Sequence, residues 1–211
     1  MTRKPKPILF TGDNIRAIMD GRKTQTRRII KGLPEHADML HYHPIPYPLI
    51  PELAGKLSWF EPEAGDYWPC SRNAAFPCPY GHPGDALWCR ETWALNRLYN
   101  PYYKAAGSKF VYRANTPDTW GDYPQYIKWN PSIFMPYEAA RLFLRVESVR
   151  VERLMDISGE DAVAEGVLSR LPENGIAQAQ FADLWQSIHG AGSWAQNPWV
   201  FVIEFSRTEK P

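Results

Sequence analysis

The sequence has few cysteines, no long apolar run and almost no excess of charge of either sign. Its 211 residues include three cysteines, and an odd number argues against a disulfide framework. No stretch approaches the length of a membrane span, and no signal-peptide pattern opens the chain. With 24 Lys and Arg against 23 Asp and Glu, the surface as a whole has no general attraction for nucleic acid. We therefore expect a cytoplasmic protein without a membrane partner, whose contacts with nucleic acid are local.

Proline and aromatic residues are abundant instead. The chain contains 20 Pro, 9 Trp and 11 Tyr, and much of this excess lies between Leu33 and Pro136. Disordered chains are poor in aromatic residues, so we expect loops anchored by aromatic side chains. We predict a single domain over residues 1–211 with insertions at about 33–82 and 96–136, and the frequent prolines of the first insertion argue against regular structure there.

Regular patterns occupy the two ends of the chain. Period-2 alternation and apolar runs predict strands, and the longest of them shifts its alternation near Ser148, as a β-bulge would cause. Apolar spacing with capping residues predicts short helices. The predicted strands are 6–10, 23–30, 83–93, 108–114, 140–154 and 197–207, and the predicted helices are 11–20, 158–166 and 181–190. This order favours a mostly β, α+β fold: a small, mostly antiparallel β-barrel with peripheral helices.

The ends of two predicted helices are well marked. Thr11 or Asp13 can cap the first helix, and Gly21 can adopt the left-handed conformation that ends it. Ser158 begins a capping box with the acidic residue three positions later, and Gly166 ends that helix.

A basic stretch follows the first helix and contains a compact polar group. In the strand 23–30, Thr26 and Arg28 share one face, and Lys23 at the preceding turn can reach the same space. A partly desolvated lysine beside Arg28 would have a lowered pKa and could act as a base toward a threonine hydroxyl. The alternative is a solvated edge strand whose charges prevent aggregation. The remaining cations of the stretch, which are Arg22, Arg27 and Lys31, are expected to be solvated and to have no special role.

Glu165 is the second candidate for chemistry. It lies in the last turn of the helix 158–166, where a carboxylate opposes the helix dipole and lysine or arginine is more usual. Such a carboxylate suits a proton shuttle. The alternative is an ordinary surface glutamate.

Trp88 and Arg90 share one face of the strand 83–93. An indole and a guanidinium on one face could stack on a nucleobase and hydrogen-bond to it. The alternative is structural packing, which is the commoner role of a single aromatic residue.

Four soft ligands lie in and just after the first insertion, where they could in principle hold a metal ion. Their spacings of seven, three and six intervening residues do not match the short paired knuckles of structural zinc sites, so no metal is expected. These ligands are Cys70, Cys78, His82 and Cys89.

The segment "GRKTQTRR" resembles the signature loop of the ASCH domain, a PUA-like, RNA-associated β-barrel. The signature positions fall on Gly21, Lys23, Thr26 and Arg28. Thr26 takes the place where many members carry glutamate, and threonine there is similar to the small bacterial ASCH enzymes that hydrolyse N4-acetylcytidine. The catalytic glutamate of those enzymes falls on Glu165.

Three further segments extend this resemblance. "GDALWC" and "VIEF" are similar to core segments of the bacterial amidohydrolases. With "WNPSIFMP" and the longer forms "GDALWCRETW" and "NPWVFVIEF", nearly the whole chain resembles a group of ASCH-domain proteins common in phages and prophages.

The resemblance implies an amidohydrolase without a cofactor. Thr26 would be the nucleophile or would position one, and Lys23 would be its base. Glu165 would assist proton transfer to the departing amine, and Arg28 would hold the base or an oxyanion. The expected partner is a modified pyrimidine nucleoside or RNA, and the near-zero net charge favours the small nucleoside. The alternatives are a non-catalytic RNA- or DNA-binding module and an ASCH-type ribonuclease.

Overall fold

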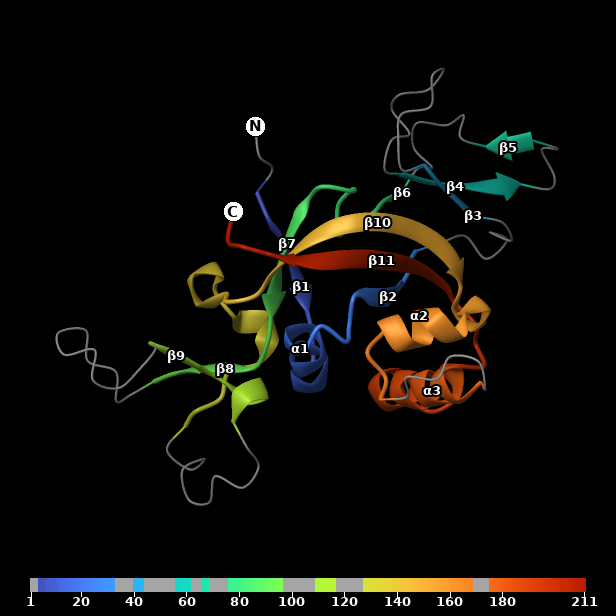
Figure 1. The fold of residues 1–211 in the computed structure, drawn as a ribbon. Coiled ribbons are helices and arrows are strands. Elements are labelled where there is room, and N and C mark those ends of the chain that lie inside the picture. Colours follow the sequence, from blue (N-terminus) through green and yellow to red (C-terminus); the bar gives the residue numbers. More distant parts are fainter. Residues whose placement is uncertain are drawn as a thin grey trace.

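A computed structural model shows the arrangement of the chain (Figure 1). It describes residues 4–32, 40–43, 56–61, 66–68, 76–96, 109–116, 127–168 and 175–211, with the backbone alone for 40–43, 56–61, 66–68 and 76–77. No helix among these residues has the length and apolar character needed to cross a membrane.

A five-stranded sheet organises the fold. Its order is β1–β7–β10–β11–β2, with β1 parallel to β7 and every other neighbouring pair antiparallel. The long strands β10 and β11 form a curved pair that arches over the helices (Figure 1), and the register of β10 shifts between Val146 and Ser148. The predicted bulge is confirmed, and a bulge bends a strand in this way. The strands are β1 (Lys6–Leu9), β2 (Gln25–Ile29), β7 (Ala86–Arg90), β10 (Phe143–Arg153) and β11 (Trp199–Thr208).

The sheet remains open in the part of the chain that the structure describes. Strands β1 and β2 stand at its two ends, and no ladder joins them there. The predicted combination of strands and helices is therefore confirmed as a mixed α/β arrangement, whereas the closed barrel is not confirmed.

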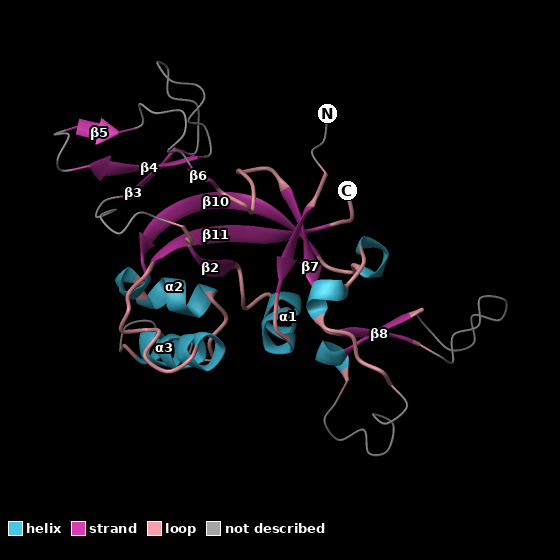
Figure 2. Cartoon of the chain, turned by 180° about the vertical axis from the view of Figure 1, so that it is seen from behind, coloured by secondary structure: helices cyan, strands magenta, loops and turns pink. Residues whose placement is uncertain are grey.

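Three α-helices lie on the concave side of the β10–β11 arch, as both views show (Figures 1 and 2). They are α1 (Gly12–Met19), α2 (Gly159–Ala164) and α3 (Ile176–His189). Thr11 caps α1, because its hydroxyl accepts from the N–H of Asn14 at 3.3 Å, and Gly21 follows with φ of +74°. Of the two predicted caps for α1, the structure therefore selects Thr11.

Strand β11 is buried on both faces. Phe201, Ile203 and Phe205 pack in the cluster between the sheet and α1, and Val200 and Val202 pack in a second cluster with α3. Each such side chain contributes about 1.5–3 kcal/mol when it leaves water. This burial on both faces joins the sheet firmly to α3, and α3 supplies one wall of the site described below.

The first insertion contains strands, contrary to the prediction for 33–82. A four-stranded sheet consists of β3 (Leu40–His43), β4 (Lys56–Glu61), β5 (Asp66–Trp68) and β6 (Phe76–Pro77). Strands β3, β4 and β5 contain no proline, because the prolines of this region fall between them. The overall frequency of proline therefore does not predict whether the segments between prolines form strands.

Short elements complete the fold. Strands β8 (Trp93–Leu95) and β9 (Phe110–Tyr112) pair antiparallel. The 3-10 turns are η3 (Arg113–Asn115), η5 (Ser132–Phe134), η6 (Tyr137–Ala139) and η7 (Leu154–Asp156).

Candidate functional site

The structure brings Lys23 and Glu165 into direct contact although 142 residues separate them in the sequence. The Lys23 Nζ donates to Oε2 of Glu165 at 2.6 Å and to the main-chain oxygen of Glu165 at 2.8 Å. Their side chains are 2% and 3% exposed. Two of the three predicted catalytic residues thus form a buried ion pair.

The turns that end α1 and α2 hold this pair together. The N–H groups of Arg22 and Lys23 both donate to the carbonyl of Ala17, at 2.8 and 3.0 Å, and Thr24 donates to Ala164 at 2.9 Å. Gly166 has φ of +90°, and a Cβ at this position would lie 2.9 Å from the Cβ of Lys23. Glycine is therefore needed at 166 both for the backbone conformation and for the close approach of Lys23.

A cavity of about 90 Å³ opens beside the ion pair and is called the Lys23 cavity below. Lys23, Thr26, Arg27, Arg28 and Glu165 line it, together with residues of α3 that include Trp185 and His189. Thr26 is 4% exposed. The structure thus gathers the three predicted catalytic residues and Arg28 around one cavity.

Burial controls the protonation of Lys23. Loss of water lowers the pKa of its ammonium group, the contact with Glu165 opposes this effect, and Arg28 and Arg27 add to the lowering. The result is a pKa below the ordinary lysine value. More of the neutral amine, which is the form that accepts a proton, is therefore available than on an exposed lysine.

Arg28 lies partly exposed at the same cavity. Its Nη2 donates to the carbonyl of Leu9 at 2.6 Å, and its guanidinium lies over the rings of Phe10 and Tyr80, 5.0 and 5.9 Å from their centroids. Burial lowers the pKa of this guanidinium, which nevertheless stays charged, as arginines do in proteins. Its Nε is buried and has no hydrogen-bond partner among the described residues. Arg28 therefore keeps a donor available.

Arg27 was predicted to be solvated, and this prediction is wrong. Its side chain has no exposure and forms ion pairs with Glu152, Asp161 and Glu165. The distances to Asp161 and Glu165 are 3.0 and 3.2 Å. The physical reason is that α2 and β10 cover the side of β2 that local sequence alone left open to solvent. No signal in residues 22–31 reveals this, because the partners lie more than 120 residues away.

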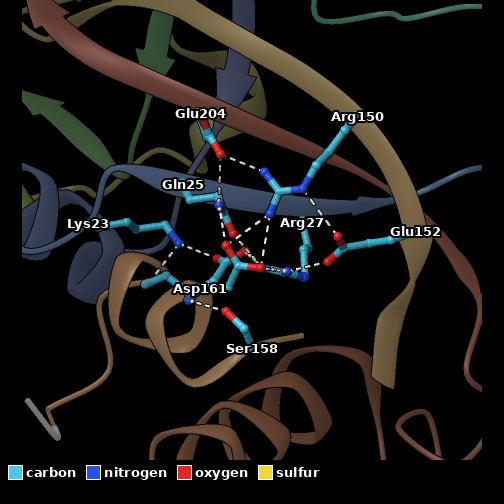
Figure 3. Close-up of polar contacts among 9 residues, drawn as sticks. Lys23, Gln25, Arg27, Arg150, Glu152, Ser158, Asp161 and Glu204 are labelled. Carbon is cyan, nitrogen blue, oxygen red and sulfur yellow. Dashed lines mark hydrogen bonds and ion pairs between the residues drawn. The ribbon is translucent and has the colours of Figure 1, made fainter. Parts of the chain in front are cut away.

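The ion pairs of Arg27 continue into a network on the same side of β2 (Figure 3). Arg150 donates to both carboxylate oxygens of Asp161 at 2.9 Å and to Glu204 at 2.5 Å. Gln25 donates to Asp161 at 2.9 Å. The capping box predicted at Ser158 forms only in part: its hydroxyl accepts from the N–H of Asp161, whereas the Asp161 carboxylate belongs to the network.

The other two cations of the basic stretch differ from each other. Arg22 is half-buried and donates to the carbonyl of Gly166 at 3.1 Å, so it supports the turn that holds Lys23 and is not merely solvated. Lys31 is exposed, as predicted.

Trp88 and Arg90 do not line the Lys23 cavity. Trp88 is 6% exposed and packs edge-on against Tyr137 with 5.5 Å between ring centroids. The guanidinium of Arg90 lies over the indole of Trp88 at 4.8 Å. The predicted pair does share one face of β7, but its indole is packed in the interior, because the η6 turn and β10 cover this face. The structure therefore does not bring these two residues to the candidate site.

Helix α3 supplies further cavity residues, whose spacing in the sequence predicted only a helix. Trp185 is 3% exposed, its ring stacks on His189 with 4.1 Å between centroids, and Ile188 is 48% exposed and lines the cavity. Burial, together with the charges of Arg28 and Lys31, lowers the pKa of His189. Helical spacing could not distinguish a side chain packed in the core from one that lines a cavity within the same apolar stripe.

The described cysteines lie in the interior. Cys78 and Cys89 are buried and free, and burial raises the pKa of the Cys78 thiol to about 11 and that of Cys89 still higher. Within the described ranges, no group of three or more His, Cys, Asp or Glu side chains is placed to hold a metal ion. Cys70 lies outside those ranges.

Comparisons of the chain with protein-family models, with curated proteins and with solved structures found no match.

Proposed function

We propose that the protein is an amidohydrolase that removes an acyl group from an N4-acylated cytidine or a similar modified pyrimidine nucleoside. The observation that carries the proposal is the buried Lys23–Glu165 pair, which shares the Lys23 cavity with Thr26 and Arg28. We also propose that the fold is that of a PUA-like ASCH domain. This assignment is supported by the "GRKTQTRR" segment and by the curved sheet with helices on its concave side.

Thr26 and Lys23 carry the first step. Neutral Lys23 accepts the hydroxyl proton of Thr26, and the threonine oxygen forms a bond to the acyl carbon. The carbonyl oxygen becomes an oxyanion, and Arg28 supplies the positive charge that stabilises it. The lowered pKa of Lys23 favours this step, because a fully protonated ammonium could not accept the proton.

Glu165 acts in the second step. The bond between the acyl carbon and N4 breaks while N4 takes a proton from the Lys23–Glu165 pair, so that the cytidine leaves with a neutral amino group. Water then hydrolyses the threonine ester, which releases a carboxylic acid and restores the hydroxyl. Arg27, 3.2 Å from Oε1 of Glu165, orients the carboxylate during these transfers.

Charge pairing favours a small substrate over a polymer. Binding along a nucleic acid chain needs several cations that are available to phosphates. In the described part of the chain, Arg27, Arg150 and Arg141 are all engaged by carboxylates. The net charge of the whole chain is +1.

Incubation with N4-acetylcytidine tests the proposal. We expect release of cytidine by the wild type, with kcat/KM reduced about 1,000-fold or more by Lys23→Met and Thr26→Val and about 100-fold by Glu165→Gln. Thr24→Val is the matched control. Thr24 is exposed, lies two residues from Thr26 and does not line the cavity, so this variant should stay within about twofold of the wild type.

Other outcomes would assign a different function. An inactive wild type that binds RNA in a salt-sensitive manner would identify a binding module. Cleavage of RNA that is lost in Lys23→Met would identify a ribonuclease. Full activity of a folded Thr26→Val variant would exclude Thr26 as the nucleophile.

A further inference from the structure

Three buried N–H donors without partners belong to side chains that line the Lys23 cavity. They are Nε of Arg27, Nε of Arg28 and Nε1 of Trp185, and none has a hydrogen-bond partner among the described residues. Buried donors are nearly always paired in native proteins. Three such donors at one cavity point to a ligand that carries acceptors.

Lys23 adds a fourth donor when it is protonated. An ammonium group has three protons, and its two hydrogen bonds to Glu165 use two of them. The Lys23 cavity therefore has donors that no acceptor of its own residues occupies.

The charge of the cavity agrees with this interpretation. Lys23 is balanced by Glu165, and Arg27 is balanced by Glu152 and Asp161, which do not line the cavity. Arg28 contacts a main-chain oxygen and two aromatic rings. Among the described residues, the charge of Glu165 acts on Arg28 without forming an ion pair with it. The positive charge of Arg28 is consequently available to an anionic ligand.

The size of the cavity limits the ligand. Its volume is about 90 Å³, whereas a cavity of about 150 Å³ holds one benzene molecule. A group smaller than a six-membered ring therefore fits inside. Leu9 and Ile188 are 40% and 48% exposed and line the same cavity, which offers apolar contacts to a ring that remains outside.

We propose that the Lys23 cavity is a binding site for a short carboxylate of two or three carbons, whose oxygens accept hydrogen bonds from Arg28 Nε and Trp185 Nε1. The proposal rests on the proposed function in one respect: the same donors would hold the acyl carbonyl of the substrate and then the carboxylate product. Trp185 is a specificity-determining residue in this arrangement. The cavity limits the acyl group to a short chain and leaves the pyrimidine at the mouth.

The indole N–H of Trp185 provides a direct readout. In ¹H–¹⁵N spectra of the full chain, its signal is assigned by its loss in Trp185→Phe. We expect acetate and propionate to shift this signal saturably, whereas chloride at equal ionic strength and hexanoate leave it in place. The signal of Trp194 should not move, because Trp194 packs on Phe181 but does not line the cavity.

Matched variants test the two donors. Trp185→Phe keeps an aromatic ring and removes the N–H, so acetate affinity, followed on other shifted signals, should fall about tenfold. Arg28→Lys keeps the charge and removes Nε, with a similar expected loss. Trp194→Phe should bind acetate as the wild type does.

Several outcomes would overturn the carboxylate site. They are an unmoved Trp185 signal at saturating acetate, equal shifts with hexanoate, and undiminished acetate affinity in Trp185→Phe. The hexanoate comparison uses only the wild type, so it holds even if a variant fails to fold. Acetate binding without hydrolysis of N4-acetylcytidine would retain this site and reject the amidohydrolase. Hydrolysis of N4-acetylcytidine without acetate binding would retain the amidohydrolase and reject the carboxylate site.

Discussion

Arg27 and Arg28 are neighbours in β2, yet their surroundings differ sharply. Three carboxylates surround Arg27, whose side chain has no exposure. Arg28 is partly exposed and contacts a main-chain oxygen and aromatic rings. Successive side chains of a strand point to opposite faces, so the two arginines meet different partners. Both line the Lys23 cavity, but only Arg27 is held by the acidic network.

The difference separates a cation that serves the fold from one that is available to a ligand. Removing one partner from a buried ionic network leaves charges without compensation, which is strongly destabilising. A cation that binds an anionic substrate must instead keep a charge that no ion pair of the fold already balances. We therefore expect Arg27 to matter most for stability and Arg28 to matter most for binding.

Replacement of Arg27 should produce the largest loss of stability. Arg27→Met leaves Glu152, Asp161 and Glu165 with less compensation, and we expect the free energy of unfolding to fall by about 3–5 kcal/mol. Arg28→Met should cost about 1–2 kcal/mol, because it loses one hydrogen bond and its contacts with aromatic rings. Urea unfolding of the two variants measures both values. Equal losses of unfolding free energy in the two variants would show that the ion pairs of Arg27 stabilise the fold no more than the contacts of Arg28 do.

Gly166→Ala should have an intermediate effect on stability and a large effect on turnover. The new Cβ would meet Lys23 at 2.9 Å, and φ is +90°. We expect a loss of about 2–4 kcal/mol from left-handed strain and crowding, and reduced hydrolysis because Lys23 is displaced. Gly175→Ala is the control. It shares a positive φ of +68° but has nothing within 4 Å of the added Cβ, so about 1 kcal/mol is expected with unchanged hydrolysis. Equal turnover in both variants would show that the close approach of Lys23 to Gly166 is not needed for hydrolysis.

The smallest effect is expected from acid titration of the network. Burial alone would raise the pKa of Asp161, but the hydrogen bond from Gln25 and the charges of Arg150 and Arg27 lower it below its ordinary value. A lowered folded-state pKa contributes stability that is present above the unfolded-state pKa and is lost as the pH falls through the folded-state pKa. The unfolding free energies of wild type and Asp161→Asn should therefore differ near neutral pH. They should converge only as the pH falls from about 4, the ordinary pKa of aspartate, through the lower folded-state pKa.

Urea unfolding at several pH values measures this convergence. Asp156→Asn, which removes an exposed carboxylate outside the network, serves as the control and should follow the wild type. A difference between wild type and Asp161→Asn that does not change with pH would contradict the titration.

Local sequence determined most elements outside the first insertion and several of the residues at which they begin, end or bulge. The positive φ of Gly21 and Gly166, the cap at Ser158 and the bulge before Ser148 all follow from residues within a few positions of each feature. Capping, left-handed glycines and alternation are local effects, so the sequence was sufficient to predict them.

Tertiary structure alone decided which charges are compensated and which are available. Arg27 and Arg28 look alike in the sequence, and their partners come from β1, α2 and β10. The same holds for Trp185, which helical spacing assigns to the core but which the fold also places at the cavity. Lys23 and Glu165 were predicted to cooperate, but their contact depends on packing between segments 142 residues apart. These contacts form because segments that are distant in the sequence cover some side chains and leave others exposed. The residues next to a side chain in the sequence do not reveal which segment will cover it.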